Sequence, residues 1–204
     1  MNIVLSLIAL GIGVILHEYM HGWTADKFGD STARLAGRLT LNPIAHIDLV
    51  GSIILPIFFL MTGLPGFGWA KPVPVNFGAL RNPKRDMIWV GLAGPATNIV
   101  IATIGSVVLR IGFVNPASIL ETFLIDLVVI NLILAIFNMV PIPPLDGSRI
   151  VMGLLPDRLA YEYGKLERVG FIILIFLLYM GMFTKILGPV VNSITQIFLG
   201  HSYM

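Results

Sequence analysis

The chain has 204 residues, of which 56% are hydrophobic and only 12% are charged, and its mean hydropathy is +0.90. Because soluble domains contain about 25% charged residues, this composition excludes an ordinary soluble domain and indicates one membrane-embedded domain spanning 1–204. A formal net charge of +2 gives no indication of a nucleic-acid partner, and the sequence has no cysteine for disulfides or thiolate zinc sites.

The first apolar run leads into a candidate metal site. The 14 residues from Ile3 to Leu16 carry no charge. As a helix they rise about 21 Å, so His17 is expected two-thirds of the way through a hydrocarbon core about 30 Å thick. On that helix His17 and His21 lie one above the other, where two imidazole nitrogens can bind one metal ion. Glu18 points about 100° further round, beside an open coordination position.

This spacing is typical of a metal hydrolase. A zinc ion lowers the pKa of a bound water to about 7, the glutamate takes the proton, and the hydroxide attacks a carbonyl group. Such a site needs a third protein ligand and an open fourth position. The alternative is that the two histidines and the glutamate share this spacing by chance, which a membrane setting disfavours because unpaired polar groups are costly there.

A polar connection from 29 to 48 follows, with a turn predicted at Asn42-Pro43. His46 in this connection is a candidate contact to the metal or the substrate, although a lone loop histidine more often has a structural role. The next apolar run, 49–62, has only 14 residues. A helix of that length is about 21 Å long, so we expect a re-entrant segment and not a full crossing.

Residues 63–76 are rich in glycine and proline and are predicted to be extended. Non-helical backbone at membrane depth is tolerated only where protein or water covers it, as in an active-site cleft. An extended edge there can hold an unwound substrate by strand addition, with Trp69, Lys71 and Pro72 as candidate substrate contacts. An interfacial loop anchored by Trp69 and Lys71 is an equal alternative.

Two longer apolar runs, 87–112 and 119–140, are predicted to be spanning helices. Asn98 and Asn138 are polar side chains at membrane depth, so each needs a partner within the bundle. After the second helix the chain turns at three prolines, which fix a bend that carries Asp146. Asp146 is the best candidate for the third zinc ligand; its alternative role is to cap the N-terminus of a helix that follows it.

The last part of the chain comprises an interfacial stretch, a fourth spanning helix over 169–183 and a short helix over 186–199. If 49–62 is re-entrant, 11 of the 13 lysines and arginines lie on the side of the metal site and only Arg110 and Lys185 lie opposite; a full crossing gives 8 against 5. The positive-inside rule favours the first arrangement, with the metal site toward the cytoplasm. The fold class is therefore an all-α polytopic membrane protein with about four spanning helices and a re-entrant segment.

Three motifs occur along the chain: His17-Glu18-x-x-His21, Gly94-Pro95-Ala96-x-Asn98 and Asn138-x-x-Pro-x-Pro-Pro-Leu-Asp146-Gly147. Together they resemble the motifs of the site-2 protease family of intramembrane zinc metalloproteases. Segments 42–46 and 68–76 look like those of small prokaryotic members.

The resemblance implies hydrolysis of peptide bonds within or beside a transmembrane segment of a substrate protein, in a prokaryotic cell membrane. It implies one zinc ion held by His17, His21 and Asp146, with Glu18 as the base and the two motif asparagines near the substrate or the oxyanion. The PDZ-like and nucleotide-sensing domains of larger members are not expected here. A membrane metal-ion transporter that uses the same three ligands is the alternative, although no internal repeat is visible.

Overall fold

The computed structural model describes residues 2–62, 68–112, 114–181 and 183–200. These residues form α-helices joined by short turns and irregular links, with no β-strand among them, so the predicted all-α fold is confirmed. The helices are α1 (Ile3–Lys27), α2 (Thr32–Leu35), α3 (Leu55–Thr62), α4 (Pro83–Arg110), α5 (Ile119–Asn138), α6 (Asp146–Leu154), α7 (Asp157–Gly164), α8 (Glu167–Tyr179) and α9 (Gly188–Leu199).

Three helices are long and apolar enough to cross a membrane: α1, α4 and α5, with 25, 28 and 20 residues. A fourth span results if α8 and the 184–199 stretch are counted together as one broken crossing. The two parts are bent by 68° relative to each other. The expectation of about four spanning helices is therefore confirmed. The chain is an integral multi-pass membrane protein.

The central bundle consists of α4 packed against α1, α5 and α6. Its apolar core includes Ala102 on α4 together with Val128 and Leu132 on α5, all at most 2% exposed. A small residue at position 102 lets the two helices approach closely, as is typical of helix packing in membranes. At the start of α5, the Ser118 hydroxyl accepts a hydrogen bond from the N–H of Glu121 and caps the helix.

The short apolar run folds as a π-helical turn, Leu49–Ile54, followed by α3. Asp48 caps this run because its carboxylate accepts hydrogen bonds from the N–H groups of Val50 and Gly51. Residues 68–76 are non-helical, as predicted, while 63–67 of the predicted extended segment lie outside the described residues.

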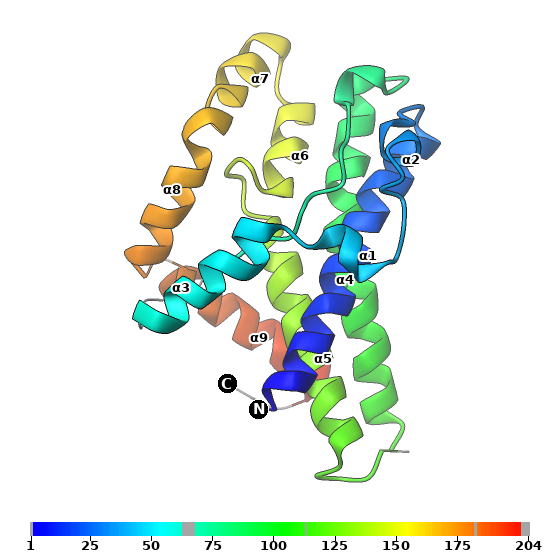
Figure 1. Ribbon diagram of the computed structural model, residues 1–204, viewed down its shortest axis with the longest axis vertical. Helices are drawn as coiled ribbons and strands as arrows, with labels where there is room; N and C mark the ends of the chain where they lie inside the picture. The colour runs from blue at the N-terminus through cyan, green and yellow to red at the C-terminus, as the bar shows by residue number, and fades with distance from the viewer. Residues whose placement is uncertain (1, 63–67, 113, 182, 201–204) are drawn as a thin grey trace.

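Figure 1 shows how the chain returns after α3. The C-terminal end of α1, the start of α4, and α6 and α7 all lie at one end of the molecule, whereas the N-terminus and the α4–α5 link lie at the other. The segment between α1 and α4 therefore leaves and rejoins the same end. This is the arrangement expected of a re-entrant segment, and it brings the start of α6 beside the C-terminal half of α1.

Candidate metal centre and adjoining cavity

Three side chains predicted to be metal ligands converge in the bundle. His17 Nε2 lies 3.0 Å from His21 Nε2 and 3.1 Å from Asp146 Oδ2, and His21 Nε2 lies 3.2 Å from Asp146 Oδ1. Both histidines are buried on α1, and the Asp146 side chain is 17% exposed. Asp146 is the first residue of α6, after Leu145 at the N-cap position, so its carboxylate faces the histidines instead of capping a later helix.

The separation of the donor atoms fits a tetrahedral zinc site. Zinc–ligand bonds of about 2.0–2.1 Å place tetrahedral ligand atoms about 3.3 Å apart, close to the separations observed here. Asp146 Oδ2 is buried and has no hydrogen-bond partner, although it lies beside His17. Burial raises the pKa of Asp146, but in the metal-free cluster the protonated His21 and His17 imidazoles beside it hold that pKa well below its usual range. An ionised carboxylate and two imidazoles are a donor set that binds zinc.

Each imidazole is oriented by a hydrogen bond at its Nδ1 atom. His17 Nδ1 lies 2.6 Å from Asn98 Oδ1, and His21 Nδ1 lies 2.7 Å from the carbonyl oxygen of Val90. Both of these oxygens only accept hydrogen bonds, so each Nδ1 carries the ring proton. The Nε2 lone pairs of His17 and His21 are then free to face a metal ion.

Two glycines make the convergence possible. A Cβ atom at Gly94 on α4 would lie 2.5 Å from both His17 Cε1 and His21 Nε2. A Cβ atom at Gly147, next to Asp146, would lie 2.2 Å from the carbonyl oxygen of Met139. Neither position has room for a side chain, so Gly94 allows α4 to approach the imidazoles and Gly147 allows the start of α6 to pack against the main chain at Met139.

Glu18 lies beside the metal-donor cluster, and main-chain atoms orient it. Its Oε2 accepts a hydrogen bond of 2.8 Å from the N–H of Val73 in the non-helical segment 68–76. That segment is fixed elsewhere, because the N–H of Trp69 donates to Gly51 O at 3.2 Å and that of Lys71 donates to His46 O at 2.9 Å. The contact with Val73 has no signal in the sequence, since any residue other than proline supplies a backbone N–H.

A cavity of about 1470 Å³ adjoins the cluster. Its lining is predominantly apolar and comes from α1, α5, α8, the segments 43–59 and 68–72, and residues 144–145. The predicted site residues in this lining are His17, Glu18, His46, Trp69, Pro72 and Asn138. Asn98 and Lys71 are not among the described lining residues, and Asn98 instead lies behind His17.

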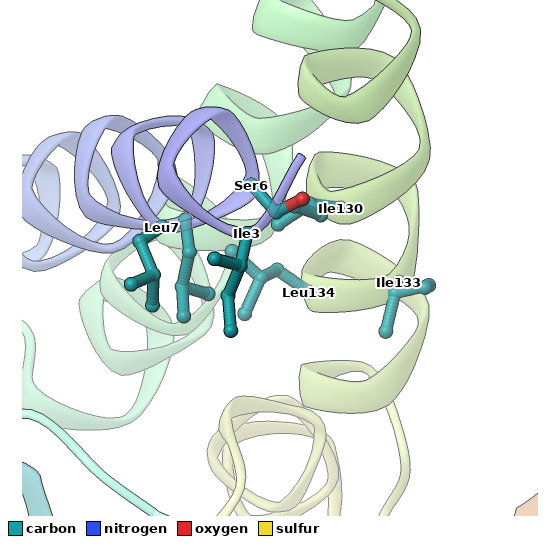
Figure 2. Close-up of a pocket in the computed structure, with 7 residues that line it drawn as sticks. Ile3, Ser6, Leu7, Ile130, Ile133 and Leu134 are labelled. Carbon is teal, nitrogen blue, oxygen red and sulfur yellow. The ribbon is translucent and has the colours of Figure 1, made fainter. Parts of the chain in front are cut away.

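His46 is buried, with an exposed fraction of 3%. Its Nε2 lies 2.9 Å from the carbonyl oxygen of Thr40, and it is not in the group of described residues that could hold a metal ion. A second, smaller pocket of about 260 Å³ lies at the N-terminal end of α1, against α5 (Figure 2). Leu7, Leu10 and Leu134 line both spaces, so an apolar groove continues along α1 to the metal centre.

Fold and site together define a membrane-embedded metalloenzyme with two histidines four residues apart on a spanning helix and an aspartate from a later helix. Residues 115–181 match the family model described as Peptidase family M50. YwhC of Bacillus subtilis, which bears the name of a predicted zinc metalloprotease, is 36% identical over 194 residues, covering 92% of this chain and 85% of that protein.

Two further relatives bear names of the same kind. Rip2 of Mycolicibacterium smegmatis is 30% identical over 169 residues, covering 82% of this chain and 63% of that protein. A protein of Methanocaldococcus jannaschii is 34% identical over 148 residues, covering 72% of this chain and 69% of that protein. No solved structure shows a significant match. The chain belongs to peptidase family M50, the site-2 proteases, and is a zinc metallopeptidase.

Proposed function

We propose that this chain is a single-domain intramembrane endopeptidase that hydrolyses peptide bonds in or beside transmembrane segments of other membrane proteins, in regulated intramembrane proteolysis. The observation that carries the proposal is an apolar cavity of about 1470 Å³ whose lining includes Glu18 and His17, one member of the His17/His21/Asp146 cluster. Pockets for small ligands are about 300–1,000 Å³, so this space suits a peptide segment better. Its position within the helix bundle suits a segment that arrives from the bilayer.

In this proposal His17, His21 and Asp146 are the zinc ligands and Glu18 is the general base. Zinc, when bound, supplies a Lewis acid that activates a water molecule and polarises a carbonyl oxygen. Glu18 takes a proton at Oε1, because Oε2 is engaged by the N–H of Val73. It then delivers that proton to the amine nitrogen that leaves when the peptide bond breaks. The Val73 contact keeps the carboxylate turned toward the cavity throughout.

The segment 68–76 is our candidate for the surface that binds the substrate backbone. A peptide must be unwound for cleavage, since a helix engages its own carbonyl groups. Along one edge of this segment, the N–H groups of Trp69, Lys71 and Val73 donate to other parts of the protein. The other edge includes Ala70 and Pro72, which line the cavity.

The prolines give that edge an unusual hydrogen-bonding character. Pro72 and Pro74 have no N–H, so this edge has carbonyl acceptors but no donors at these two positions, and the Pro72 carbonyl already accepts a hydrogen bond of 3.3 Å from Arg38 Nη2. A substrate strand beside it would be bound through its own N–H groups. Its carbonyl groups would then stay unpaired and accessible to attack. Asn138 and His46, in the cavity wall, are further candidates for substrate contacts.

We also propose that the centre is reached from the cytoplasmic side of the membrane. The start of α4, α6 and α7 lies at the same end of the molecule as the C-terminal end of α1 (Figure 1). Loops and helix ends at this end carry most of the lysine and arginine residues, which favours a cytoplasmic location.

The test compares wild-type protein with Glu18→Gln in detergent, on a panel of transmembrane peptides, with bound zinc measured in both. Glu121→Gln, which changes a glutamate at the first turn of α5, is the matched control. We expect cleavage by wild type and the control only, with equal zinc in all three. Bound zinc with no cleavage by wild type, together with metal flux in liposomes that survives Glu18→Gln, would favour a transporter instead.

A further inference from the structure

A chain of buried polar contacts leads away from the metal centre across three helices. Asn98 Oδ1 lies 2.6 Å from His17 Nδ1, and Asn98 Nδ2 lies 2.8 Å from Asn131 Oδ1 and 3.1 Å from Gly13 O. Asn131 Nδ2 in turn lies 2.8 Å from the carbonyl oxygen of Leu127. Both asparagines have an exposed fraction of 0%, so water does not compete for these contacts.

The direction of each hydrogen bond in this series of polar contacts is fixed by main-chain carbonyl groups, which only accept. Because Leu127 O can only accept, the amide nitrogen of Asn131 faces it and Oδ1 faces Asn98. The amide nitrogen of Asn98 then has two acceptors, Asn131 Oδ1 and Gly13 O. A reversed Asn98 amide would place its oxygen against both of these oxygens, so Oδ1 must face His17.

We infer that Asn131 is a positioning residue that holds Asn98 in this orientation and thereby holds His17 as the tautomer with its proton on Nδ1. The inference rests on the proposed metal site. With the proton on Nδ1, the lone pair of Nε2 points toward Asp146 and the metal position. With the opposite tautomer, a proton would lie there instead and would have to be displaced before a metal ion could bind.

The two histidine ligands differ in how they are held. His21 Nδ1 donates to Val90 O, a main-chain group that needs no further orientation. His17 depends on side-chain amides, which rotate unless their own partners fix them. A Cβ atom at Gly13 would lie 2.8 Å from Asn131 Oδ1, so this glycine gives α1 the close approach that the contacts require. Loss of Asn131 should therefore disturb His17 and leave His21 unchanged.

The test uses the full chain in detergent with two variants of Asn131. Asn131→Leu keeps the approximate size but removes the acceptor. Asn131→Asp restores it, because a carboxyl group protonated in this buried site donates to Leu127 O and accepts from Asn98. The readouts are the zinc dissociation constant by chelator competition and the ring 15N shifts of the metal-free protein, which report each histidine's tautomer. Thr195→Val, which alters a fully buried polar residue on α9, is the control for damage to packing.

We expect Asn131→Leu to raise the zinc dissociation constant by about 10–100-fold and to give a mixture of tautomers at His17 only. Asn131→Asp and Thr195→Val should stay close to wild type. If Asn131→Leu does not fold, Asn131→Ala removes the same acceptor without added bulk. Wild-type zinc affinity in a folded Asn131→Leu or Asn131→Ala, or a neutral His17 imidazole with its proton on Nε2 in the metal-free wild type, would overturn the inference. A wild type that binds no zinc would overturn the metal site itself.

Discussion

Replacing Gly94 with alanine should abolish tight zinc binding while the helix bundle still folds. The new Cβ would lie 2.5 Å from His17 Cε1 and from His21 Nε2, whereas ordinary contacts of a Cβ atom are 3.4–4 Å. At least one imidazole must therefore move by about 1 Å, which is well beyond the tolerance of about 0.2 Å for a metal–ligand distance. Disturbing a partner behind a ligand costs about 10–100-fold in metal affinity. Displacing the ligand itself should cost at least about 100-fold, or about 2.7 kcal/mol.

The assay is chelator competition on purified protein, with thermal unfolding to confirm the fold. Gly105→Ala is the matched control, because position 105 lies on the same helix about 16 Å further along. A Cβ atom there would also be too close to a neighbouring side chain, but that side chain is on α5 and not on α1. There the new Cβ would lie 2.9 Å from Val128 Cγ2, so this variant also disturbs helix packing but leaves the metal site untouched. Gly94→Ala with the zinc affinity of wild type would show that these histidines do not share a metal ion in this arrangement.

Three further substitutions separate the parts of the site. Val73→Pro removes the N–H that orients Glu18, so we expect slower peptide cleavage at unchanged zinc content. Val73→Ala keeps that N–H and should stay active. Equal cleavage rates for the two variants would contradict the role of this contact. Gly147→Ala would drive a Cβ to 2.2 Å from Met139 O and should lower both zinc affinity and the unfolding temperature. Asp146→Asn should bind zinc at least about 100-fold more weakly, and a chelator should no longer shift its unfolding temperature.

Much of the metal site could be predicted because its signals are local. The spacing of His17 and His21 fixes a shared face on any helix, and the prolines before Asp146 mark a bend where the chain can turn back toward them. The end of the molecule at which they meet followed from the length of 49–62 and from the distribution of basic residues. These features depend on helix geometry and bilayer thickness, which do not vary with tertiary packing.

The contacts around the ligands could not be predicted for a different reason. A polar residue such as Asn98 or Asn131 within an apolar helix signals that it has a partner, but the periodicity identifies only its face and not the helix opposite. Asn98 lies behind His17, and Asn131 lies behind Asn98, because three helices cross at that depth. The contact between Val73 and Glu18 is made by a main-chain group, which residue types do not reveal.

A metal ion in the proposed site would also stabilise the packing of the helices that carry its ligands. Without a metal ion, protons would have to bridge His17 Nε2, His21 Nε2 and the Asp146 carboxylate, which lie 3.0–3.2 Å apart in a buried site. A buried polar group without a partner costs about 1–3 kcal/mol, and more when it is charged. In the proposed site, a zinc ion would be the shared partner of these groups and would join α1 to α6, whose connection along the chain is more than 100 residues long. We therefore expect bound zinc to stabilise the contact between the helix that carries Glu18 and the helix that completes the site.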